Sequence, residues 1–312
     1  MSALLFELGP ASAPLPSVTR SPRRRAPVAA QVSIAESLVP AALSALPARH
    51  RGELHTLVQG ECVEVLDRLP PESVDLVFAD PPYHLSNGGT TCSGGQRVAV
   101  DKGSWDQSRG MAWDLEFHRG WLAACRRVLK PTGTLWVSGT QHVIFRVGYL
   151  LQEAGWHLLN TVTWFKPNAS PNLGCRQLTH STELLIWAAP ARTEPLAHTF
   201  NYAEMKAAAG GVQMRDLWQF NPPGRREKTH GRHPTQKPIA LLERVIDATT
   251  RPGDLVVDPF NGSGTTGVVV VARGRRYLGI DLEAEYLDLT HRRLADPAAA
   301  LADDTPDTEE EQ

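Results

Sequence analysis

The sequence predicts an α/β fold built on a doubly wound, mainly parallel β-sheet. Its 312 residues are 42% hydrophobic and 21% charged, which suits one large soluble domain or two small ones. Between residues 51 and 295, short β-branched runs alternate with amphipathic stretches, the pattern of parallel strands joined by helices. Two Asp-Pro motifs directly follow apolar runs, and open α/β sheets bind ligands at the carboxyl ends of such strands.

Strands are expected wherever a short run of apolar, often β-branched residues is bounded by turn-forming residues. The runs that meet this description are Leu54–Val58, Val74–Ala79, Thr134–Ser138, Leu158–Trp164, Glu183–Ala188, Leu255–Val257 and Tyr277–Ile280.

Helices are expected where apolar side chains recur every three or four residues. Phe117, Trp121 and Cys125 share one face of such a stretch, and Pro238 stands at the first turn of another, a position that favours proline. The expected helices are Phe117–Leu129, Val143–Glu153, Pro238–Thr250, one that starts within Gly262–Gly267, and Glu283–Leu294.

The two ends of the chain differ from its middle in composition. Residues 1–50 hold seven prolines, eleven alanines, five arginines and two acidic residues, so this Pro/Ala/Arg-rich arm is expected to be disordered. Residues 296–312 carry seven acidic residues and no basic one, which predicts a disordered acidic tail. A folded domain is therefore expected over residues 51–295.

The near-neutral total charge comes from these ends. The formal charge of −2 is the sum of +3 for the arm, −7 for the tail and +2 for the middle, so it does not exclude a nucleic-acid partner. No apolar run approaches the roughly 18 residues that cross a bilayer, and no signal peptide is recognisable. These features predict a cytoplasmic protein without a membrane partner. The arm could imitate a transit peptide, but its low complexity explains its composition equally well.

The cysteines do not indicate a metal site. Cys62, Cys92, Cys125 and Cys175 lie far apart, without a Cys-x-x-Cys pair or a histidine pair at ligand spacing. We therefore expect reduced thiols, no disulfide scaffold and no bound metal.

Two long segments interrupt the alternation of strands and helices. Residues 84–112 are rich in Gly, Ser and Thr and follow a predicted strand, and residues 190–232 form an irregular insert with a net charge of +3. Loops of this length inside a compact domain are usually functional or disordered.

The first candidate site is Asp80-Pro81-Pro82-Tyr83, which follows the run Val74–Ala79. A single Asp-Pro at this place often does no more than end a strand. Two prolines before an aromatic residue also hold the backbone extended and leave carbonyls without competing amide donors. A carboxylate, a rigid carbonyl and a flat ring are thereby presented to one small polar ligand.

The second candidate site is the stretch Asp258–Gly267, which follows a short apolar run and opens a helix. Gly262 and Gly264 permit a tight turn and a close approach of a ligand to the backbone. Asp281 ends the next strand, from where an acid can reach ribose hydroxyls. With Gly267, these glycines also satisfy the Gly-x-Gly-x-x-Gly dinucleotide fingerprint, so an NAD-dependent dehydrogenase and a plain glycine-rich turn are both alternatives.

Together the two motifs resemble the S-adenosylmethionine-dependent DNA amino-methyltransferases, which modify N6 of adenine or N4 of cytosine. The Asp-Pro-Pro-Tyr motif precedes the glycine loop, and His233–Pro238 stands just before that loop, an order similar to that of the β-class enzymes. The resemblance covers roughly residues 54–294. Several segments are most similar to the single-strand-tolerant adenine methyltransferases grouped with the second enzyme of the DpnII restriction system: His84–Gly89, Val100–Asp106, Val128–Gly133, Trp164–Asn168 and Thr179–Glu183. His84 departs from the family, where Asn or Phe is more usual, and this departure concerns substrate fit.

The resemblance implies a Rossmann-like methyltransferase sheet and assigns the transfer to Asp80, Pro81, Pro82 and Tyr83. An exocyclic amine is a poor nucleophile because its lone pair is delocalised into the ring. Asp80 and the Pro81 carbonyl would accept the two amine hydrogens and localise that lone pair, and Tyr83 would stack on the base. Because the target is hidden in a duplex, the base must be flipped out or presented single-stranded.

The resemblance also implies S-adenosyl-L-methionine as the cofactor. Its methionine end would lie on the glycine loop, its ribose at Asp281 and its adenine at Glu61 and Cys62. Thr235 and Lys237 would close over it, although Lys237 equally suits a solvated helix start. The implied cofactor-binding residues are Glu61, Cys62, Asp80, Thr235, Lys237, Asp258, Phe260, Gly262, Gly264, Thr265 and Asp281.

DNA contacts are expected from the basic insert at 190–232, although a solvated surface loop is the alternative. Arginine pairs with phosphates or with guanine edges. The loop at 84–112 is a candidate flap that orders when DNA binds. The expected DNA-binding residues are Arg215, Arg225, Arg226, Lys228 and Arg232.

The sequence therefore predicts a site-specific DNA methyltransferase acting on N6 of adenine, within restriction-modification or as an orphan epigenetic enzyme. N4 of cytosine is the nearest alternative, and Asp80, rather than Ser, favours adenine. A dehydrogenase leaves residues 80–83 unexplained, and a non-enzymatic DNA-binding module predicts a damaged motif. Expected partners are double-stranded or single-stranded DNA, a second copy of the chain and a cognate restriction endonuclease, in the bacterial cytoplasm at the nucleoid.

Overall fold

The computed structural model describes residues 34–86, 90–93, 96–99, 102–193, 195–297 and 301. From Ile34 onward these residues form one compact unit. Eleven strands lie in the described part: β1 Ala48–Arg51, β2 His55–Gln59, β3 Val74–Ala79, β4 Thr90–Ser93, β5 Gln96–Ala99, β6 Leu129–Gly139, β7 His157–Phe165, β8 Thr182–Ala189, β9 Leu217–Gln219, β10 Leu255–Asp258 and β11 Arg276–Asp281.

Helices connect most of these strands, as the alternating sequence pattern predicts. Two short 3₁₀ turns, η1 at Ser104–Asp106 and η2 at Arg226–Lys228, lie in the long connections. The α-helices of the described part are α1 Ile34–Ala45, α2 Cys62–Leu66, α3 Met111–Val128, α4 Ile144–Glu153, α5 Tyr202–Ala208, α6 Ile239–Thr249, α7 Thr265–Ala272 and α8 Ala284–Ala295.

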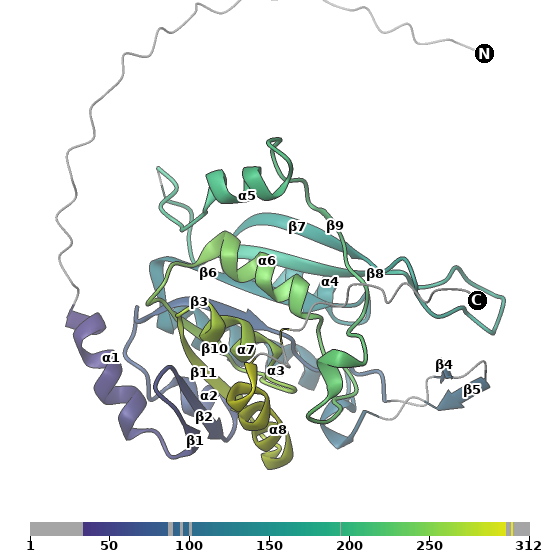
Figure 1. Ribbon diagram of the computed structural model, residues 1–312, viewed down its shortest axis with the longest axis horizontal. Helices are drawn as coiled ribbons and strands as arrows, with labels where there is room; N and C mark the ends of the chain where they lie inside the picture. Colours follow the sequence, from purple (N-terminus) through teal and green to yellow (C-terminus); the bar gives the residue numbers. More distant parts are fainter. Residues whose placement is uncertain are drawn as a thin grey trace, which may run out of the picture. The chain divides into compact units, whose positions relative to one another are not determined.

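One large sheet organises the fold, with the strand order β1-β2-β11-β10-β3-β6-β8-β7-β9 (Figure 1). Strands β2, β11, β10, β3 and β6 run parallel, whereas β8 is antiparallel to both β6 and β7. The carboxyl ends of the parallel strands consequently meet at one end of the sheet, where β8 begins. We call this end the catalytic edge, because the predicted catalytic motif follows β3 there.

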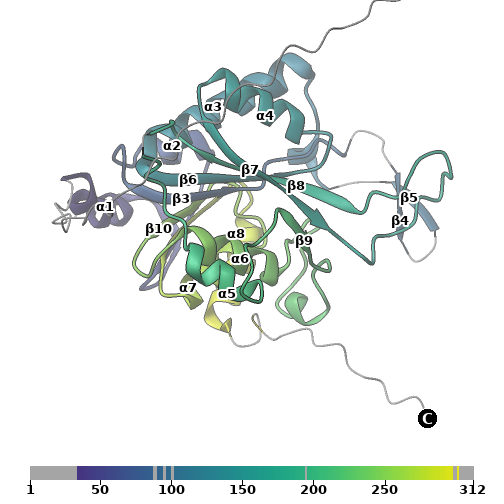
Figure 2. The same ribbon diagram turned by 90° about the horizontal axis from the view of Figure 1, so that it is seen from above.

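Both faces of the sheet are buried, which is why its central strands read as continuous apolar runs. In β3, Val77 and Ala79 pack with α2, α3 and α4, whereas Leu76 and Phe78 pack with α6, α7 and α8. Figure 2 shows these two helical layers on opposite sides of the sheet. The doubly wound fold predicted from the sequence is confirmed, and each predicted strand and helix overlaps an observed one.

The prediction of disorder through residue 50 is wrong for its last part. Residues 34–50 form α1 and enter β1, an edge strand antiparallel to β2. Val39 and Leu46 are buried against the α3 side of the core. The segment has few large apolar residues and carries Pro40 inside the helix, so its sequence shows no clear helical period. The few apolar contacts that it makes with the core decide its fold. Residues 1–33 and most of the acidic tail lie outside the described residues.

The two long connections contain more structure than the sequence predicts. Within 84–112, β4 and β5 form an antiparallel pair, η1 follows, and α3 already begins at Met111. In the insert 190–232, β9 pairs in parallel with β7 and so extends the main sheet. Among the helices of the described part, none is long and apolar enough to cross a membrane.

Candidate active site

A cavity of about 400 Å³ opens at the catalytic edge, at the ends of β3, β10 and β11. It brings together segments that are far apart in the chain, from Gly60 to Glu283. Of the residues predicted for catalysis or cofactor binding, those that line it are Glu61, Cys62, Asp80, Pro81, Pro82, Tyr83, Thr235, Lys237, Asp258, Phe260, Gly262, Thr265 and Asp281.

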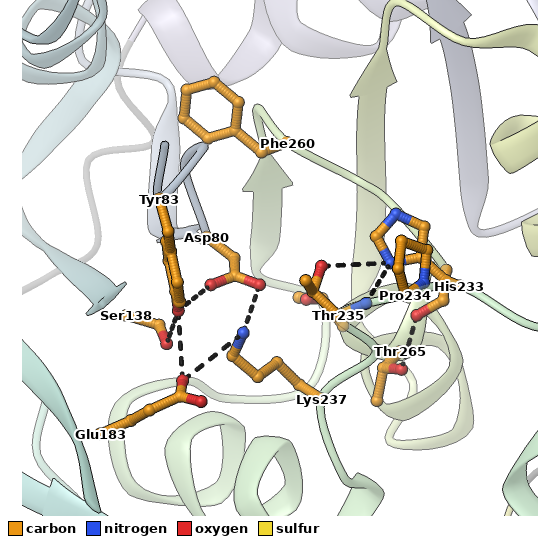
Figure 3. A network of polar contacts seen from close by, with 12 residues as sticks. Asp80, Tyr83, Ser138, Glu183, His233, Pro234, Thr235, Lys237, Phe260 and Thr265 are labelled. Carbon is orange, nitrogen blue, oxygen red and sulfur yellow. Dashed lines mark hydrogen bonds and ion pairs between the residues drawn. The ribbon is translucent and has the colours of Figure 1, made fainter. Parts of the chain in front are cut away.

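Asp80, directly after β3, lies at the centre of a polar network (Figure 3). Lys237 Nζ is 2.5 Å from Asp80 Oδ2, and the Tyr83 hydroxyl donates to Asp80 Oδ1 at 2.6 Å. The same hydroxyl lies 2.9 Å from Ser138 Oγ and 3.2 Å from Glu183 Oε2. Lys237, predicted as a cofactor ligand, is therefore an ion-pair partner of the carboxylate that is predicted to be catalytic.

The two carboxylates of this network differ in proton affinity. Burial raises the pKa of Asp80 above its ordinary value, and the Lys237 ammonium offsets only part of that effect. Burial also opposes ionisation of Glu183, but Lys237 and Lys166 together hold its pKa below the ordinary value. When the pKa values of two neighbouring carboxylates are shifted in opposite directions, one usually accepts the proton and the other balances charge. Asp80 is thus the better proton acceptor, and Glu183 the more permanent anion.

Asp106, in η1, holds the backbone that follows the catalytic motif. Its buried carboxylate accepts from the backbone N–H groups of Tyr83, His84, Leu85 and Ser86 at 2.8–3.0 Å, and from the Ser86 hydroxyl at 2.9 Å. Several N–H groups converging on one carboxylate fix a turn that has no ladder partner. His84 itself adopts a left-handed φ of 57° in this turn.

The glycine loop after β10 is organised by Asp258. Its carboxylate accepts from Phe260 N at 3.0 Å and from Thr266 Oγ1 at 2.7 Å. Burial raises the pKa of Asp258 to about 7, despite these two hydrogen bonds. Asp281 likewise accepts from Gly262 N at 2.7 Å and Glu283 N at 2.9 Å, and burial raises its pKa to about 6.

Gly264 does not line the cavity, so its predicted contact with the cofactor is replaced by a structural role. It caps α7 with a left-handed φ of 70°, and a Cβ there would lie 2.3 Å from Thr290 Cγ2. Thr265, the next residue, does line the cavity and accepts from the buried Arg293 guanidinium at 2.9 Å. The loop is consequently packed tightly onto α8.

Glu61 and Cys62 lie where β2 passes into α2. Glu61 caps this helix by accepting from Glu64 N at 3.0 Å. The buried Cys62 thiol donates to Glu61 Oε1 at 3.2 Å, and burial raises the pKa of this thiol. The thiol is therefore a neutral, apolar surface rather than a nucleophile.

The segment that carries Thr235 and Lys237 is tied to the loop after the catalytic motif. Lys102 Nζ donates to the Pro234 carbonyl at 3.2 Å, and the Trp105 and His233 rings stack with centroids 6.0 Å apart. Thr235 N and the Thr235 hydroxyl both lie 3.3 Å from His233 Nδ1. Burial lowers the pKa of His233 to about 3, so its ring is neutral and acts as a hydrogen-bonding wall.

The residues predicted to bind DNA lie outside the cavity. Arg215, Arg225, Arg226 and Arg232 are exposed, whereas Lys228 is half-buried and donates to the Pro223 carbonyl at 2.6 Å. Glu227 accepts from Ile239 N at 2.9 Å, and the Glu227 carbonyl accepts from Gln236 at 2.9 Å. Residues 225–228 are therefore fixed beside the segment that bears Lys237.

Sequence reasoning missed Glu183, Ser138 and Asp106 as members of the site. Glu183 lies near the start of β8, and its signal was a single acid ahead of a buried apolar run. Because β8 runs antiparallel to β6, its first residues reach the catalytic edge, which a pattern of alternating helices and strands does not reveal. In the described part, no group of three or more His, Cys, Asp or Glu side chains is arranged to hold a metal ion.

The side chains that line the cavity suit a positively charged nucleoside. Asp80 and Asp258 supply negative charge deep in the cavity, and Asp281 lies where a ribose hydroxyl can donate to it. Phe260 is fixed against Trp121 and Phe117, with ring centroids 5.5 and 6.1 Å away, and adds a flat apolar wall. A sulfonium joined to adenosine matches this combination of acids and apolar surface.

Comparison with known proteins gives the same result. The sequence profile of a family described as DNA methylase matches residues 74–292. Type II methyltransferase M2.DpnII of Streptococcus pneumoniae is 49% identical over 238 residues, 76% of this chain and 88% of that protein. Type II methyltransferase M2.LlaDCHI of Lactococcus lactis subsp. cremoris is 48% identical with the same coverage.

A solved structure extends the comparison to the fold and the ligand. The complex of M1.HpyAVI with S-adenosylmethionine (SAM) matches with a TM-score of 0.56 and 25% sequence identity, over 77% of this chain and 98% of that chain. The two relatives are methyltransferases, and this neighbour binds SAM, so the glycine loop is that of a methyltransferase rather than of a dehydrogenase.

Proposed function

The chain belongs to the DNA methylase family and is a SAM-dependent DNA methyltransferase, and on that basis we propose that it methylates N6 of adenine in DNA. One observation carries the assignment of residues: a single cavity joins Asp80-Pro81-Pro82-Tyr83 to the glycine loop after β10. The amine acceptors and the acids that suit the cofactor are thus within one continuous space.

The chemistry at the amine is derived from these positions. Bound SAM supplies an electrophilic methyl group on a cationic sulfur. Asp80 and the Pro81 carbonyl each accept one N–H of the target amine, so its lone pair is directed away from the ring. As the N–C bond forms and the C–S bond breaks with its electrons going to sulfur, one amine proton passes to Asp80. The raised pKa of Asp80 suits this acceptance.

Asp258, Asp281 and Phe260 hold the cofactor end of the cavity. The carboxylate of Asp258 would balance the charge of the cationic methionine end, Asp281 would accept from the ribose hydroxyls, and Phe260 would add an apolar wall beside them. Glu61, Cys62 and Thr235 line the remaining wall, and the buried thiol of Cys62 offers apolar contact. Tyr83 is 6% exposed and its hydroxyl is held at Asp80, so its ring is fixed for stacking on a base that enters.

Adenine is favoured over cytosine by the first residue of the motif and by the relatives. Asp80 is a charged acceptor, where a serine would be neutral, and the segments flanking the site are similar to adenine-modifying enzymes. The relatives are type II methyltransferases, which supports a role in restriction-modification, with a cognate restriction endonuclease as partner. Such an enzyme works on DNA at the bacterial nucleoid, as a monomer or as a homodimer.

DNA is held by the basic residues at the catalytic edge. Arg225, Arg226, Lys228 and Arg232 belong to the segment that leads into Lys237, and their charge attracts the phosphate backbone. The β4–β5 pair lies at the same end of the sheet as the loop between β7 and β8, in both views (Figures 1 and 2). Closure of residues 84–112 over bound DNA completes the contact surface.

The reaction is tested by replacing Asp80 with alanine. Asp80→Ala removes the proton acceptor and one of two amine acceptors, so methyl transfer falls by a factor of about 100 to 10,000. Cofactor binding is retained in large part, because Asp258, Asp281 and Phe260 are untouched. Transfer of labelled methyl to DNA and calorimetric titration with SAM measure the two effects. An active Asp80→Ala enzyme contradicts the mechanism.

The target base is tested separately by mass spectrometry of nucleosides from DNA treated with the wild-type enzyme. N6-methyladenine is the expected product. N4-methylcytosine without N6-methyladenine contradicts the adenine assignment and leaves the roles of Asp80 and Pro81 intact. Sequencing that detects modified bases, after expression in an unmethylated host, then gives the recognition sequence.

A further inference from the structure

A second carboxylate, Glu183, is buried close to the catalytic one, and the transfer of methyl to the amine described above does not use it. The side chains of Asp80, Glu183 and Lys237 are 16%, 11% and 7% exposed. Lys166 also pairs with Glu183. Two acids and two ammonium groups thus form a neutral, desolvated cluster, and the Tyr83 hydroxyl lies within hydrogen-bonding distance of both acids.

In this cluster the Lys237 ammonium occupies the position on Asp80 where the target amine has to bind. Its ammonium donates to Asp80 Oδ2 at 2.5 Å and lies 5.1 Å from the centroid of the Tyr83 ring. The exocyclic amine of a bound target base is expected in the same place. It too would donate from nitrogen to Asp80, beside the ring that stacks on the base. A lysine fixed in this position competes with the substrate and weakens Asp80 as an acceptor, because an adjacent cation stabilises the ionised carboxylate.

Glu183 offers the lysine another partner at short range. Lys237 Nζ is 3.8 Å from Glu183 Oε2, so a small rotation of the side chain exchanges one carboxylate for the other. A buried ammonium can leave Asp80 only if a second anion receives it, because an unpaired buried charge is costly. Glu183 is suited to this task because β8 fixes its backbone and Lys166 fixes one of its oxygens.

We propose that Glu183 is a positioning residue for methyl transfer, which takes over Lys237 when the target amine enters and so frees Asp80 to accept the amine proton. The proposal rests on Asp80 being the amine acceptor. In the empty enzyme Lys237 neutralises Asp80 and keeps it ionised. In the substrate complex Lys237 pairs with Glu183, and Asp80 binds the amine.

The charges facing Asp80 support this exchange. Besides the neutral Tyr83 hydroxyl after β3, the groups that face it are Lys237 ahead of α6, Glu183 in β8, and Asp258 at the end of β10 across the cavity. Moving Lys237 toward Glu183 draws the nearest cation away from Asp80 and leaves the Tyr83 hydroxyl, Asp258 and the target amine as its neighbours. The proton affinity of Asp80 therefore rises at the moment when a proton is to be accepted.

Glu183→Gln tests the exchange because it removes the second anion and keeps the shape of the side chain. Lys237 then remains on Asp80, and the turnover number falls on the order of 100-fold with little change in SAM affinity. The acid limb of the pH–rate profile moves to lower pH by about one unit, because Lys237 stabilises the ionised form of Asp80 and the repulsion from Glu183 is lost. Glu153→Gln, the same substitution at an acid that pairs with Arg119 outside the cavity, is the control and leaves this limb unmoved.

Two double variants separate the exchange from a defect of charge or folding. Glu183→Gln with Lys166→Met restores the net charge of the cluster but still leaves Lys237 on Asp80, so turnover stays low. Glu183→Gln with Lys237→Met removes the competing ammonium and recovers about tenfold of the lost turnover at saturating SAM, at the alkaline plateau of its own pH–rate profile, where the unpaired Asp80 is ionised. Thermal melting and SAM titration of each variant report its folding.

The outcomes are distinguishable from those of the proposed function. If the wild-type enzyme makes no N6-methyladenine, the adenine assignment fails, whatever Glu183 does. If the wild-type enzyme is active and Glu183→Gln retains its turnover and pH profile, the exchange is wrong. Rescue by Lys166→Met instead of Lys237→Met also overturns it, because that result makes Glu183 a counter-ion for Lys166 alone.

Discussion

Asp258 and Asp281 show how burial prepares a site for a cation at the scale of single residues. Both carboxyls are fixed by backbone N–H groups, yet desolvation raises their pKa values to about 7 and about 6. In the empty protein these acids are therefore partly protonated near neutral pH. A positively charged cofactor pairs with the ionised form, so its binding is linked to the release of protons.

SAM affinity is accordingly expected to depend on pH. Below pH 7 Asp258 takes up a proton that must leave before the cation binds, and Asp281 follows below pH 6. The association constant should fall on the order of 1,000-fold from pH 8 to pH 5, about 100-fold from Asp258 and about tenfold from Asp281. Calorimetry in buffers of different ionisation enthalpy measures both the affinity and the protons released. An affinity that is constant over this range contradicts the assignment, and Asp258→Asn should bind weakly with a flatter profile.

Among the elements, the start of α7 shows why the glycine loop needs glycine for two different reasons. Gly262 lines the cavity, and its N–H donates to Asp281. Gly264 is turned away from the cavity, and its left-handed backbone packs against Thr290 of α8. The motif is thus partly a ligand contact and partly a helix-packing signal, and the sequence alone gives both glycines the same role.

A matched pair of alanine substitutions measures the packing part. Gly264 and Gly274 have nearly the same φ, 70° and 69°, but a Cβ at Gly264 overlaps Thr290, whereas a Cβ at Gly274 has open space. Gly274→Ala should lower the free energy of unfolding by about 1 kcal/mol through backbone strain alone. Gly264→Ala should lower it by about 2–4 kcal/mol, because steric overlap adds to the same strain. Chemical denaturation measures both, and equal losses argue against the contact with Thr290.

At the scale of the whole molecule, the sheet topology divides the insert 190–232 between two edges. Strand β8 leaves the catalytic edge and ends at Ala189, opposite His157 at the start of β7. Asn201 N donates to the Ala248 carbonyl near the end of α6, which holds the start of α5 at the far edge. Strand β9 then runs back alongside β7, so residues 220–232 return to the catalytic edge. Among the described residues of the insert, only this second half lies at the catalytic edge.

DNA binding should follow this division. Arg225→Ala, at the catalytic edge, should weaken binding to duplex DNA and reduce the slope of log affinity against log salt by about 1. Lys206→Ala, an exposed residue of α5 at the far edge, is the matched control and should change neither value. Fluorescence anisotropy over a salt series measures both variants. A loss with Lys206→Ala that equals the loss with Arg225→Ala contradicts the proposed DNA surface.

Local patterns were sufficient for much of the fold and for the two strand-end motifs that line the cavity. The run Val74–Ala79 predicts a buried strand, and the polar residues directly after it line the site, because strand ends at one edge are where a parallel sheet binds ligands. Glu183 was not predictable in this way. Its place in the site depends on the antiparallel insertion of β8 between β6 and β7. A single acid ahead of an apolar run does not reveal this non-local pairing.

The sequence by itself determined the fold class and the two strand-end motifs, because these depend on residue type and local period, and its resemblance to the DNA amino-methyltransferases implied the cofactor. The tertiary structure decided which charges meet. It paired Lys237 with Asp80 across 157 residues, buried Glu183 beside both, and turned Gly264 away from the cavity. The reason is that electrostatic coupling depends on distance and desolvation, and both are set by how distant segments pack rather than by their order in the chain.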